Sequence, residues 1–326
     1  MKIAAFSFCE ERKMCGRTAC TLDPDVLPKA CQYKDRKGKK RQPKWRENDS
    51  SKYFPSYNVS PQSYTPILVS CKFRSQGAKE QVSDDERELQ AMKWGLVPSW
   101  HRGDPSSFGY KMNNARIESI TEKKSFKGAL ERGRRCVVLA EGFYEWQEVK
   151  GGGPKQPYFI YFKENVNHEK NSEVKRDETM PARPLLTMAG IFDMWQSASQ
   201  EEPLYTYSVM TLEAKAPFNT IHHRVPAILK DEEAVRQWLD CDEVKYDQAL
   251  KLLSPEDCLD WHPVSKAVNN SKYKEPDCVK EIDLSLAEKK AEKSKITNWF
   301  KKSPKKRETS SGSTEEPSSK REKLEQ

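Results

Sequence analysis

The pattern of apolar and polar residues predicts a chain that folds mainly into β-strands. Four runs are rich in β-branched and aromatic side chains, as strands are, and they cover residues 134–146, 157–162, 185–195 and 204–212. Two other stretches, 231–239 and 246–253, have apolar residues three and four positions apart and acidic starts, which is typical of amphipathic helices. The pattern therefore predicts an α+β fold dominated by antiparallel strands.

Polar stretches set the limits of the folded part. Residues 287–326 are mostly Lys, Glu, Ser and Pro, a composition that predicts a disordered basic tail. A second polar stretch at about 165–184 indicates a surface insertion, and 150–156 indicates a turn between two strands. We expect one domain at 15–286, preceded by residues 1–14 as a leader or an unprocessed N-terminal extension.

Composition narrows the classes of function. The chain has 326 residues and a net charge of +8, and the last 39 residues hold twelve Lys or Arg against seven Asp or Glu. Because the body is only mildly basic, a nucleic-acid surface has to come from the arrangement of charges. No stretch approaches the ~20 apolar residues of a membrane span. The nine Cys form no CxxC pair, which favours reduced thiols in the cytosol or nucleus over a disulfide framework or a zinc site.

Three polar clusters carry the candidate chemistry. They lie at 113–119, 140–147 and 221–229, and their central residues are Asn114, Arg116, Glu145 and His222. Each has an ordinary alternative, because a strand carboxylate such as Glu145 can face water, a His beside an apolar run is more often structural, and Arg116 can be a surface charge. No phosphate loop, nucleophile elbow or HExxH helix is present, so the sequence predicts neither a cofactor nor a metal.

Cys15, which follows Met14, has special chemistry if it is the first residue of the mature chain. An N-terminal Cys carries a thiol and an α-amine on adjacent carbons, and that amine has a pKa of about 8, well below the value of about 10.4 for Lys. The amine can form an imine with an aldehyde, and the thiol can then close a five-membered thiazolidine. An internal Cys has only an amide nitrogen, and burial as a small apolar side chain is then expected.

Eight motifs occur in an order that resembles the SRAP (SOS-response-associated peptidase) family. They are MCGRTAC, PSYNVSPQ, KWGLVPSW, NNARIES, RRCVVLAEGFYEW, LTMAGIFDMW, IHHRVPAIL and WHPVSKAVNN, and the resemblance extends over residues 14–279. It implies a single domain with a barrel-like core and flanking helices. It also implies binding of single-stranded DNA and a covalent thiazolidine crosslink to abasic sites, formed through an N-terminal Cys.

The resemblance assigns roles to ten residues, motif by motif. The catalytic residues that it implies are Cys15 as the nucleophile, Asn114, Glu145 and His222. The DNA-binding residues that it implies are Arg17, Trp94, Pro98, Ser99, Trp100 and Arg116. In these roles a carboxyl acts as an acid, an imidazole transfers protons, arginines bind phosphates and aromatic rings stack on bases.

Exposure of the nucleophile decides between the possible functions. Thirteen residues precede Met14, so we expect the native mature chain to start at Cys15, with an abasic-site crosslinking or lyase-type activity and an autoproteolytic exposure of the thiol. Two alternatives are an autoprocessing peptidase that acts only on its own Met14–Cys15 bond and a non-covalent reader of modified (5-hydroxymethylcytosine) DNA. A monomer is expected in each case.

An apolar island in the tail adds a candidate partner. Residues 293–300 place Ile296, Trp299 and Phe300 on one face of a short helical turn. This segment resembles the PCNA-interacting box of replication proteins, with Lys in place of the usual Gln, and its alternative is a helix that packs back on the domain. The basic run 301–307 is typical of a nuclear import signal. We therefore expect a nuclear protein at replication forks.

Overall fold

The computed structural model describes residues 16–73, 86–109, 111–148, 152–163, 184–197 and 202–286. Residues 16–282 of this set belong to one compact unit, which contains all the strands and α-helices named below. Cys15 and the leader lie outside the described residues, as do nearly all of the expected insertion and the whole tail with its 293–300 segment.

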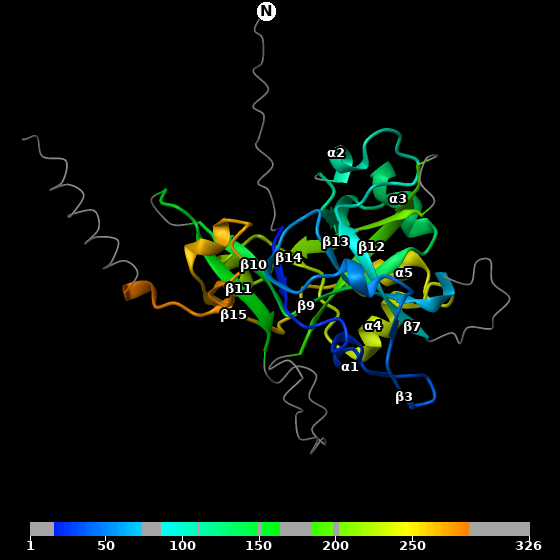
Figure 1. Cartoon of the computed structure of the whole chain (residues 1–326), viewed down its shortest axis with the longest axis horizontal. Helices are drawn as coiled ribbons and strands as arrows, with labels where there is room; N and C mark the ends of the chain where they lie inside the picture. Colours follow the sequence, from blue (N-terminus) through cyan, green and yellow to red (C-terminus); the bar gives the residue numbers. More distant parts are fainter. Residues whose placement is uncertain are drawn as a thin grey trace, which may run out of the picture. The chain divides into compact units, whose positions relative to one another are not determined.

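Two large sheets form the fold (Figure 1). The strands are β1 (Thr18–Cys20), β2 (Tyr33–Lys34), β3 (Lys40–Arg41), β4 (Lys44–Trp45), β5 (Ser56–Val59), β6 (Tyr64–Ser70), β7 (Arg87–Trp94), β8 (Asn114–Arg116), β9 (Arg135–Ala140), β10 (Gly142–Gln147), β11 (Gln156–Phe162), β12 (Leu186–Trp195), β13 (Leu204–Glu213), β14 (Arg224–Pro226) and β15 (Leu259–Pro263). The first sheet has the order β15-β11-β10-β1-β5. The second has the order β14-β13-β12-β9-β6-β7-β4, with β8 paired to β13, and β2 and β3 form a separate pair.

A parallel pairing of β13 with β7 joins two distant strands of the second sheet. The path β13-β12-β9-β6-β7 therefore returns to its first strand and forms a barrel-like ring. Most of the other pairings are antiparallel. The predicted α+β fold, dominated by antiparallel strands around a barrel-like core, is confirmed.

The predicted run 134–146 contains two strands that belong to different sheets. β9 pairs with β12 and β6, whereas β10 pairs with β1 and β11, so the chain passes between the sheets at Glu141. The Glu141 carboxylate accepts a hydrogen bond from the hydroxyl of Thr21 (2.7 Å) at this crossing. Gly142 follows, and a Cβ there would lie 2.5 Å from the carbonyl oxygen of Ile160, so only Gly permits this close approach of β11.

The helices flank the sheets, and two of them form where the sequence predicts. They are α1 (Leu27–Ala30), α2 (Pro105–Gly109), α3 (Lys124–Glu131), α4 (Glu232–Leu239) and α5 (Tyr246–Lys251). The Asp231 carboxylate caps α4 by accepting the N–H of Ala234 (2.8 Å). The sequence analysis missed α3, which buries Phe126, Ala129 and Leu130 on one face. None of the described helices is long and apolar enough to cross a membrane.

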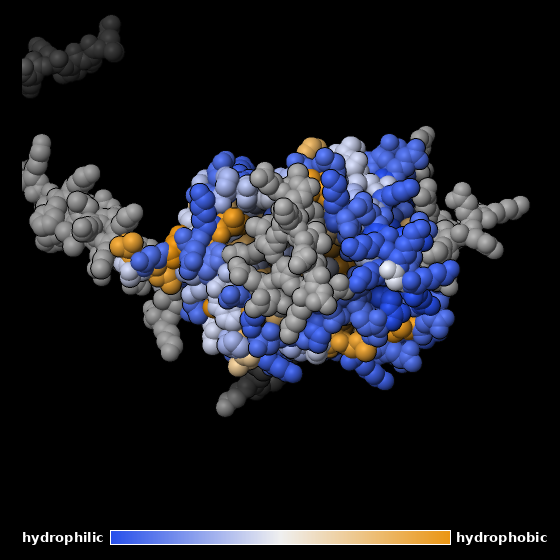
Figure 2. Space-filling view, turned by 90° about the horizontal axis from the view of Figure 1, so that it is seen from below, coloured by the Kyte–Doolittle hydropathy of each residue, from blue (hydrophilic) through white to orange (hydrophobic). Residues whose placement is uncertain are grey.

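The main hydrophobic core consists mostly of side chains from the second sheet and the helices. A smaller hydrophobic core consists of side chains from the first sheet and the segment after it. Side chains such as Ile67, Leu89 and Met210 are completely buried in the main core. The smaller core gathers Tyr144 and Phe159 with neighbours from the segment after β15. On the face shown in Figure 2, hydrophilic residues cover most of the described surface, and hydrophobic residues form only scattered patches.

Candidate active site beside the start of β1

The first described residues, Gly16 and Arg17, lie beside the strand that carries Glu145. β1 pairs antiparallel with β10, and the Tyr144 N–H donates to the carbonyl oxygen of Arg17 (3.0 Å). Continuing this register places Gly16 opposite Glu145. Gly16 is the residue that follows Cys15, so the predicted nucleophile is adjacent in the chain to this position.

Glu145 and His222 form a buried polar pair. Glu145 is only 4% exposed, which excludes the alternative in which its carboxylate faces water. Its Oε1 lies 3.5 Å from His222 Nδ1. The N–H and the carbonyl oxygen of Arg224 both lie 3.1 Å from the same Nδ1, so this nitrogen accepts from the Arg224 backbone in one tautomer of the ring and donates to it in the other. Burial lowers the pKa of His222, although its hydrogen bond with the Arg224 backbone opposes this, so the ring is neutral at physiological pH.

Arg224 holds the His222 ring in place from the start of β14. The two terminal nitrogens of its guanidinium donate to the two carboxylate oxygens of Glu118 (2.6 and 2.9 Å). One of them also donates to the carbonyl oxygen of Thr211 (2.7 Å) in β13. Bidentate Arg–carboxylate contacts fix geometry strongly. The sequence analysis did not single out Glu118, because its partner is 106 residues away in the chain.

Two adjacent asparagines, Asn113 and Asn114, lie at the start of β8. Asn114 begins β8 and pairs in parallel with Val209 of β13. The side-chain Oδ1 of Asn113 is buried and has no hydrogen-bond partner among the described residues. A Cβ built on Gly16 would lie 4.0 Å from Asn113 Nδ2, so this amide lies near the residue that follows the predicted nucleophile in the chain. A buried unpaired acceptor costs about 1–3 kcal/mol, and a ligand that donates to it would recover that free energy. Asn113 is thus a site residue that the sequence analysis missed.

The two arginines predicted to bind DNA have different surroundings. Arg17 is partly buried, and its Nη1 donates to Asn58 Oδ1 (2.8 Å) and to the carbonyl oxygen of Val268 (3.0 Å). These contacts connect β1 with the short 3-10 segment Lys266–Asn269. Arg116 is exposed at the end of β8. Arg116 is therefore accessible to a phosphate, whereas Arg17 contributes to the structure around the site.

The predicted wedge segment is divided between core and surface. Trp94 is 2% exposed and stacks on Tyr207, with ring centroids 6.2 Å apart. In this structure Trp94 is a core residue and not a platform for bases, and Pro98 is also buried. Trp100 is 45% exposed, and the Lys124 ammonium lies 5.6 Å from the centroid of its ring. Of the four predicted residues of this segment, Trp100 is exposed and Ser99 is half-buried.

Ser99 fixes the loop that presents Trp100. Its N–H donates to Asp193 Oδ2 (2.9 Å), and Asp193 is buried in β12. The indole N–H of Trp195, also in β12, donates to the carbonyl oxygen of His101 (3.0 Å). Two side chains of one strand thus hold the backbone on both sides of Trp100.

The site offers proton transfer and hydrogen bonding. It combines a buried carboxyl, a neutral imidazole and the amide of Asn113, and Trp100 and Arg116 are exposed elsewhere in the fold. Within the described ranges, no group of three or more His, Cys, Asp or Glu side chains is placed to hold a metal ion. The arrangement fits acid–base chemistry on a bound substrate.

Comparison with known proteins agrees with the motifs. The family model described as SOS response associated peptidase (SRAP) matches residues 14–271. The chain belongs to the SRAP family. This confirms the family predicted from the sequence, and the match includes the 113–119, 140–147 and 221–229 clusters.

Several SRAP relatives are similar over most of their length. "Abasic site processing protein HMCES" of Xenopus tropicalis is 47% identical, over 91% of this chain and 88% of that protein. "Abasic site processing protein YoqW" of Bacillus subtilis (strain 168) is 30% identical, over 70% of this chain and 86% of that protein. A crystal structure of a protein from Bacteroides thetaiotaomicron matches this chain with a TM-score of 0.61 and 25% sequence identity. The match covers 82% of this chain and 100% of the Bacteroides chain.

Proposed function

We propose that this SRAP protein senses and shields abasic sites in single-stranded DNA by forming a covalent thiazolidine crosslink through Cys15. The names of the Xenopus and Bacillus relatives, which describe abasic-site processing, support the substrate class. The observation that carries the proposal is the buried Glu145–His222 pair, with its 3.5 Å contact, opposite the residue that follows Cys15. A carboxyl and a neutral imidazole are the groups that aldehyde condensation requires.

The proposed reaction needs no reagent beyond Cys15 and the sugar. An abasic deoxyribose is mostly a closed hemiacetal, and Glu145 donates a proton as the ring opens to the aldehyde. The α-amine of Cys15 adds to the aldehyde carbon, and loss of one water gives an imine. The thiol sulfur then bonds to the imine carbon, and the thiol proton is transferred to the nitrogen. The ring holds a product that the imine alone would release by hydrolysis.

The neighbouring groups assist each step in this proposal. Neutral His222 accepts and returns protons as the amine adds and water leaves. Asn114 holds the amine or the sugar by hydrogen bonds, and the buried Oδ1 of Asn113 accepts from a sugar hydroxyl or from the amine. Asn113 borders Gly16, and Asn114 follows it at the start of β8.

DNA binding is assigned to the exposed part of the predicted set. Trp100 stacks on an unpaired base, and Arg116 binds a phosphate, because both side chains are accessible. Trp94, Pro98 and Ser99 support the loop that carries Trp100. Arg17 supports the site by holding the 3-10 segment after β15.

The proposal requires that Cys15 becomes N-terminal, by autoproteolysis or by a translation start at Met14. In cells, we propose a monomer that acts in the nucleus at replication forks. The 293–300 segment is proposed to bind PCNA there. A lyase-type reaction that proceeds through the same covalent adduct is also part of the proposal. These parts of the proposal rest on the sequence motifs of the tail and of the family.

Crosslinking of two matched chains tests the proposal. Protein that starts at Cys15 and protein that starts at Met1 with Met14→Ala, intended to block removal of the leader, are incubated with single-stranded DNA that contains one abasic site. A heat-stable adduct on a denaturing gel is expected only for the first protein, and Cys15→Ser should lose most of it because an oxazolidine is a weaker trap. An equal adduct from the Met1 protein with its leader intact would contradict the proposal.

A further inference from the structure

A cavity of about 250 Å³ lies at the opposite end of β9 from the Glu141 crossing. Its walls come from the end of β6, the end of α3 and the segment between α4 and α5. The aromatic rings of Phe73 and Tyr246 and the side chains of Leu130 and Leu239 supply its apolar lining. No residue of the candidate active site lines this cavity, so it is a separate feature of the fold.

Arg135, the first residue of β9, forms part of the cavity wall although it is only 1% exposed. Its Nη2 donates to the carbonyl oxygens of Asp240 and Val244 (2.7 Å each), and its Nε donates to the sulfur of Cys241 (3.3 Å). Its Nη1 is buried and has no hydrogen-bond partner among the described residues. The guanidinium therefore keeps one donor group unused.

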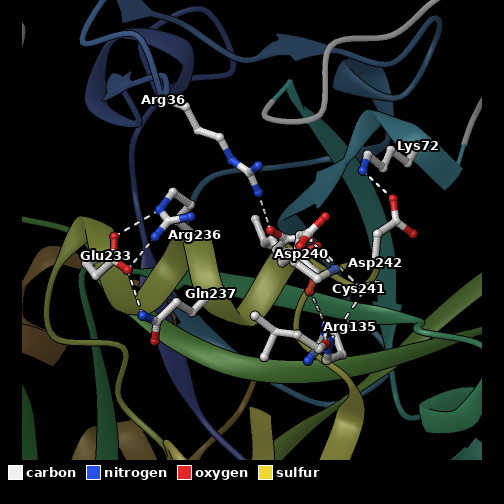
Figure 3. A network of polar contacts seen from close by, with 12 residues as sticks. Arg36, Lys72, Arg135, Glu233, Arg236, Gln237, Asp240, Cys241 and Asp242 are labelled. Atoms are coloured by element: carbon white, nitrogen blue, oxygen red, sulfur yellow. Dashed lines mark hydrogen bonds and ion pairs between the residues drawn. The ribbon is translucent and has the colours of Figure 1, made fainter. Parts of the chain in front are cut away.

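The charge of Arg135 has no counter-ion in the part of the chain that the structure describes. The nearby carboxylates pair with other cations, Asp240 with Arg36 and Asp242 with Lys72 (Figure 3). Burial raises the pKa of the Cys241 thiol, so the sulfur is neutral. A buried cation costs free energy unless an anion or a full set of acceptors compensates it. The Trp238 ring, whose centroid lies 5.4 Å from Arg135 Cζ, supplies part of this compensation, and an anion in the cavity would add to it.

The lining as a whole also favours an anion. It contains four basic side chains, Lys72, Arg132, Arg135 and Lys245, against two acidic ones, Glu131 and Asp242. The volume of about 250 Å³ is below the usual range of about 300–1,000 Å³ for ligand sites, which limits the occupant to a headgroup and about one ring.

We infer that this cavity binds a small ligand that combines an oxyanion headgroup, a phosphate or a carboxylate, with an aromatic or apolar body. The headgroup pairs with the Lys245 ammonium at the cavity wall, and the positive charge of Arg135, whose Nη1 is buried behind that wall, attracts it over a longer distance. The body lies between Phe73 and Tyr246. This site is independent of the crosslinking chemistry, and its occupant would bind to an otherwise intact protein.

Titration of the full chain with phenyl phosphate, benzoate and inorganic phosphate tests the inference. Amide signals of Gly133 and Cys241 in a ¹H–¹⁵N spectrum should shift saturably with phenyl phosphate or benzoate. Whichever of phenyl phosphate and benzoate has the lower Kd identifies the headgroup that the cavity prefers. Inorganic phosphate should bind more weakly than both because it lacks the ring. No saturable shift with either aromatic ligand up to about 10 mM, a concentration that detects even millimolar affinity, would overturn the inference.

Matched lysine variants locate the site. Lys245→Ala should raise the Kd by about 3- to 10-fold, the effect of removing one partly solvated charge contact. Lys251→Ala removes an exposed lysine of the same α5 helix that does not line the cavity, and it should leave the Kd unchanged. Arg135→Gln, which removes the buried charge, should weaken binding, and if that variant does not fold, the two lysine variants still decide. Equal Kd values for Lys245→Ala and Lys251→Ala would contradict the assigned site.

Discussion

The interior of the candidate active site and its surface differ in the groups that they offer. Inside, Glu145 and His222 lie 3.5 Å apart and are largely shielded from water. On the surface, Trp100 and Arg116 are open to solvent on separate loops and strands. Buried acid–base groups can change the rate of a reaction, whereas exposed aromatic and cationic groups mainly change affinity. The two regions should therefore separate chemistry from binding.

The strongest test of this separation removes the acid. Glu145→Gln should slow crosslinking to abasic DNA by about 10²-fold or more, because a general acid contributes at least that much. Its affinity for intact single-stranded DNA should stay within about twofold, since that DNA offers no reacting sugar. Rates from single-turnover gels and affinities from fluorescence anisotropy measure the two effects.

Glu122→Gln is the matched control, because this carboxylate is exposed and is not part of the buried pair. It should change neither quantity by more than about twofold, the size of a typical surface effect. If Glu145→Gln lowers affinity and leaves the rate of bound protein unchanged, Glu145 belongs to the binding surface and the separation fails.

The two tryptophans of the wedge segment should respond in opposite ways. Trp94→Ala should destabilise the fold by about 3–5 kcal/mol, because it empties a core position. Trp100→Ala should leave stability nearly unchanged and weaken single-strand binding by about 1–3 kcal/mol, the usual contribution of a stacked base. Denaturant melts and anisotropy titrations measure both variants. A stable Trp94→Ala protein with a selective binding defect would contradict the core assignment.

Arg116 sharpens the description of the surface. Arg116→Ala should reduce the slope of log K against log salt by about one unit, because one phosphate contact is lost. Crosslinking at saturating DNA should keep its rate. Lys251→Ala, on the distant α5 helix, serves as the control and should keep the wild-type slope. An unchanged slope in Arg116→Ala would remove this residue from the DNA surface.

The smallest expected effect is a pH dependence of stability that His222 causes. Its folded pKa is lowered, mainly by burial, below the unfolded value of about 6.5. Between these two pKa values the unfolded chain binds more protons, so the free energy of unfolding falls as the pH drops through this window. Denaturant melts at pH 7.5 and pH 5.5 should show a larger loss for the wild type than for His222→Gln. An equal loss in both proteins would mean that His222 is not the responsible group.

Local patterns predicted much of the fold. The runs around β11, β12 and β13 and the helices α4 and α5 follow directly from apolar periodicity. The division of the 134–146 run into two strands could not be predicted, because it depends on partners elsewhere in the chain. The strand β8 could not be predicted either, since Asn114–Arg116 is a strand only through its pairing with β13.

The identity of the site residues was easier to predict than their contacts and their burial. The motif identified Glu145 and His222, but their mutual contact joins positions 77 residues apart and requires the fold. Asn113 was missed because its unpaired oxygen is a property of packing and not of sequence. Trp94 and Trp100 belong to one motif, and only their exposure separates a core residue from a surface residue.

In the proposed reaction, the amine and thiol of Cys15 form the crosslink beside the Glu145–His222 pair. Mass spectrometry of the adduct, after digestion of both protein and DNA, tests it most directly. The account predicts a single modified peptide that begins at Cys15 and carries the abasic sugar with the loss of one water, in a form that resists heat. The same heat-stable modification on a lysine, or on a chain that still carries Met14, would contradict it.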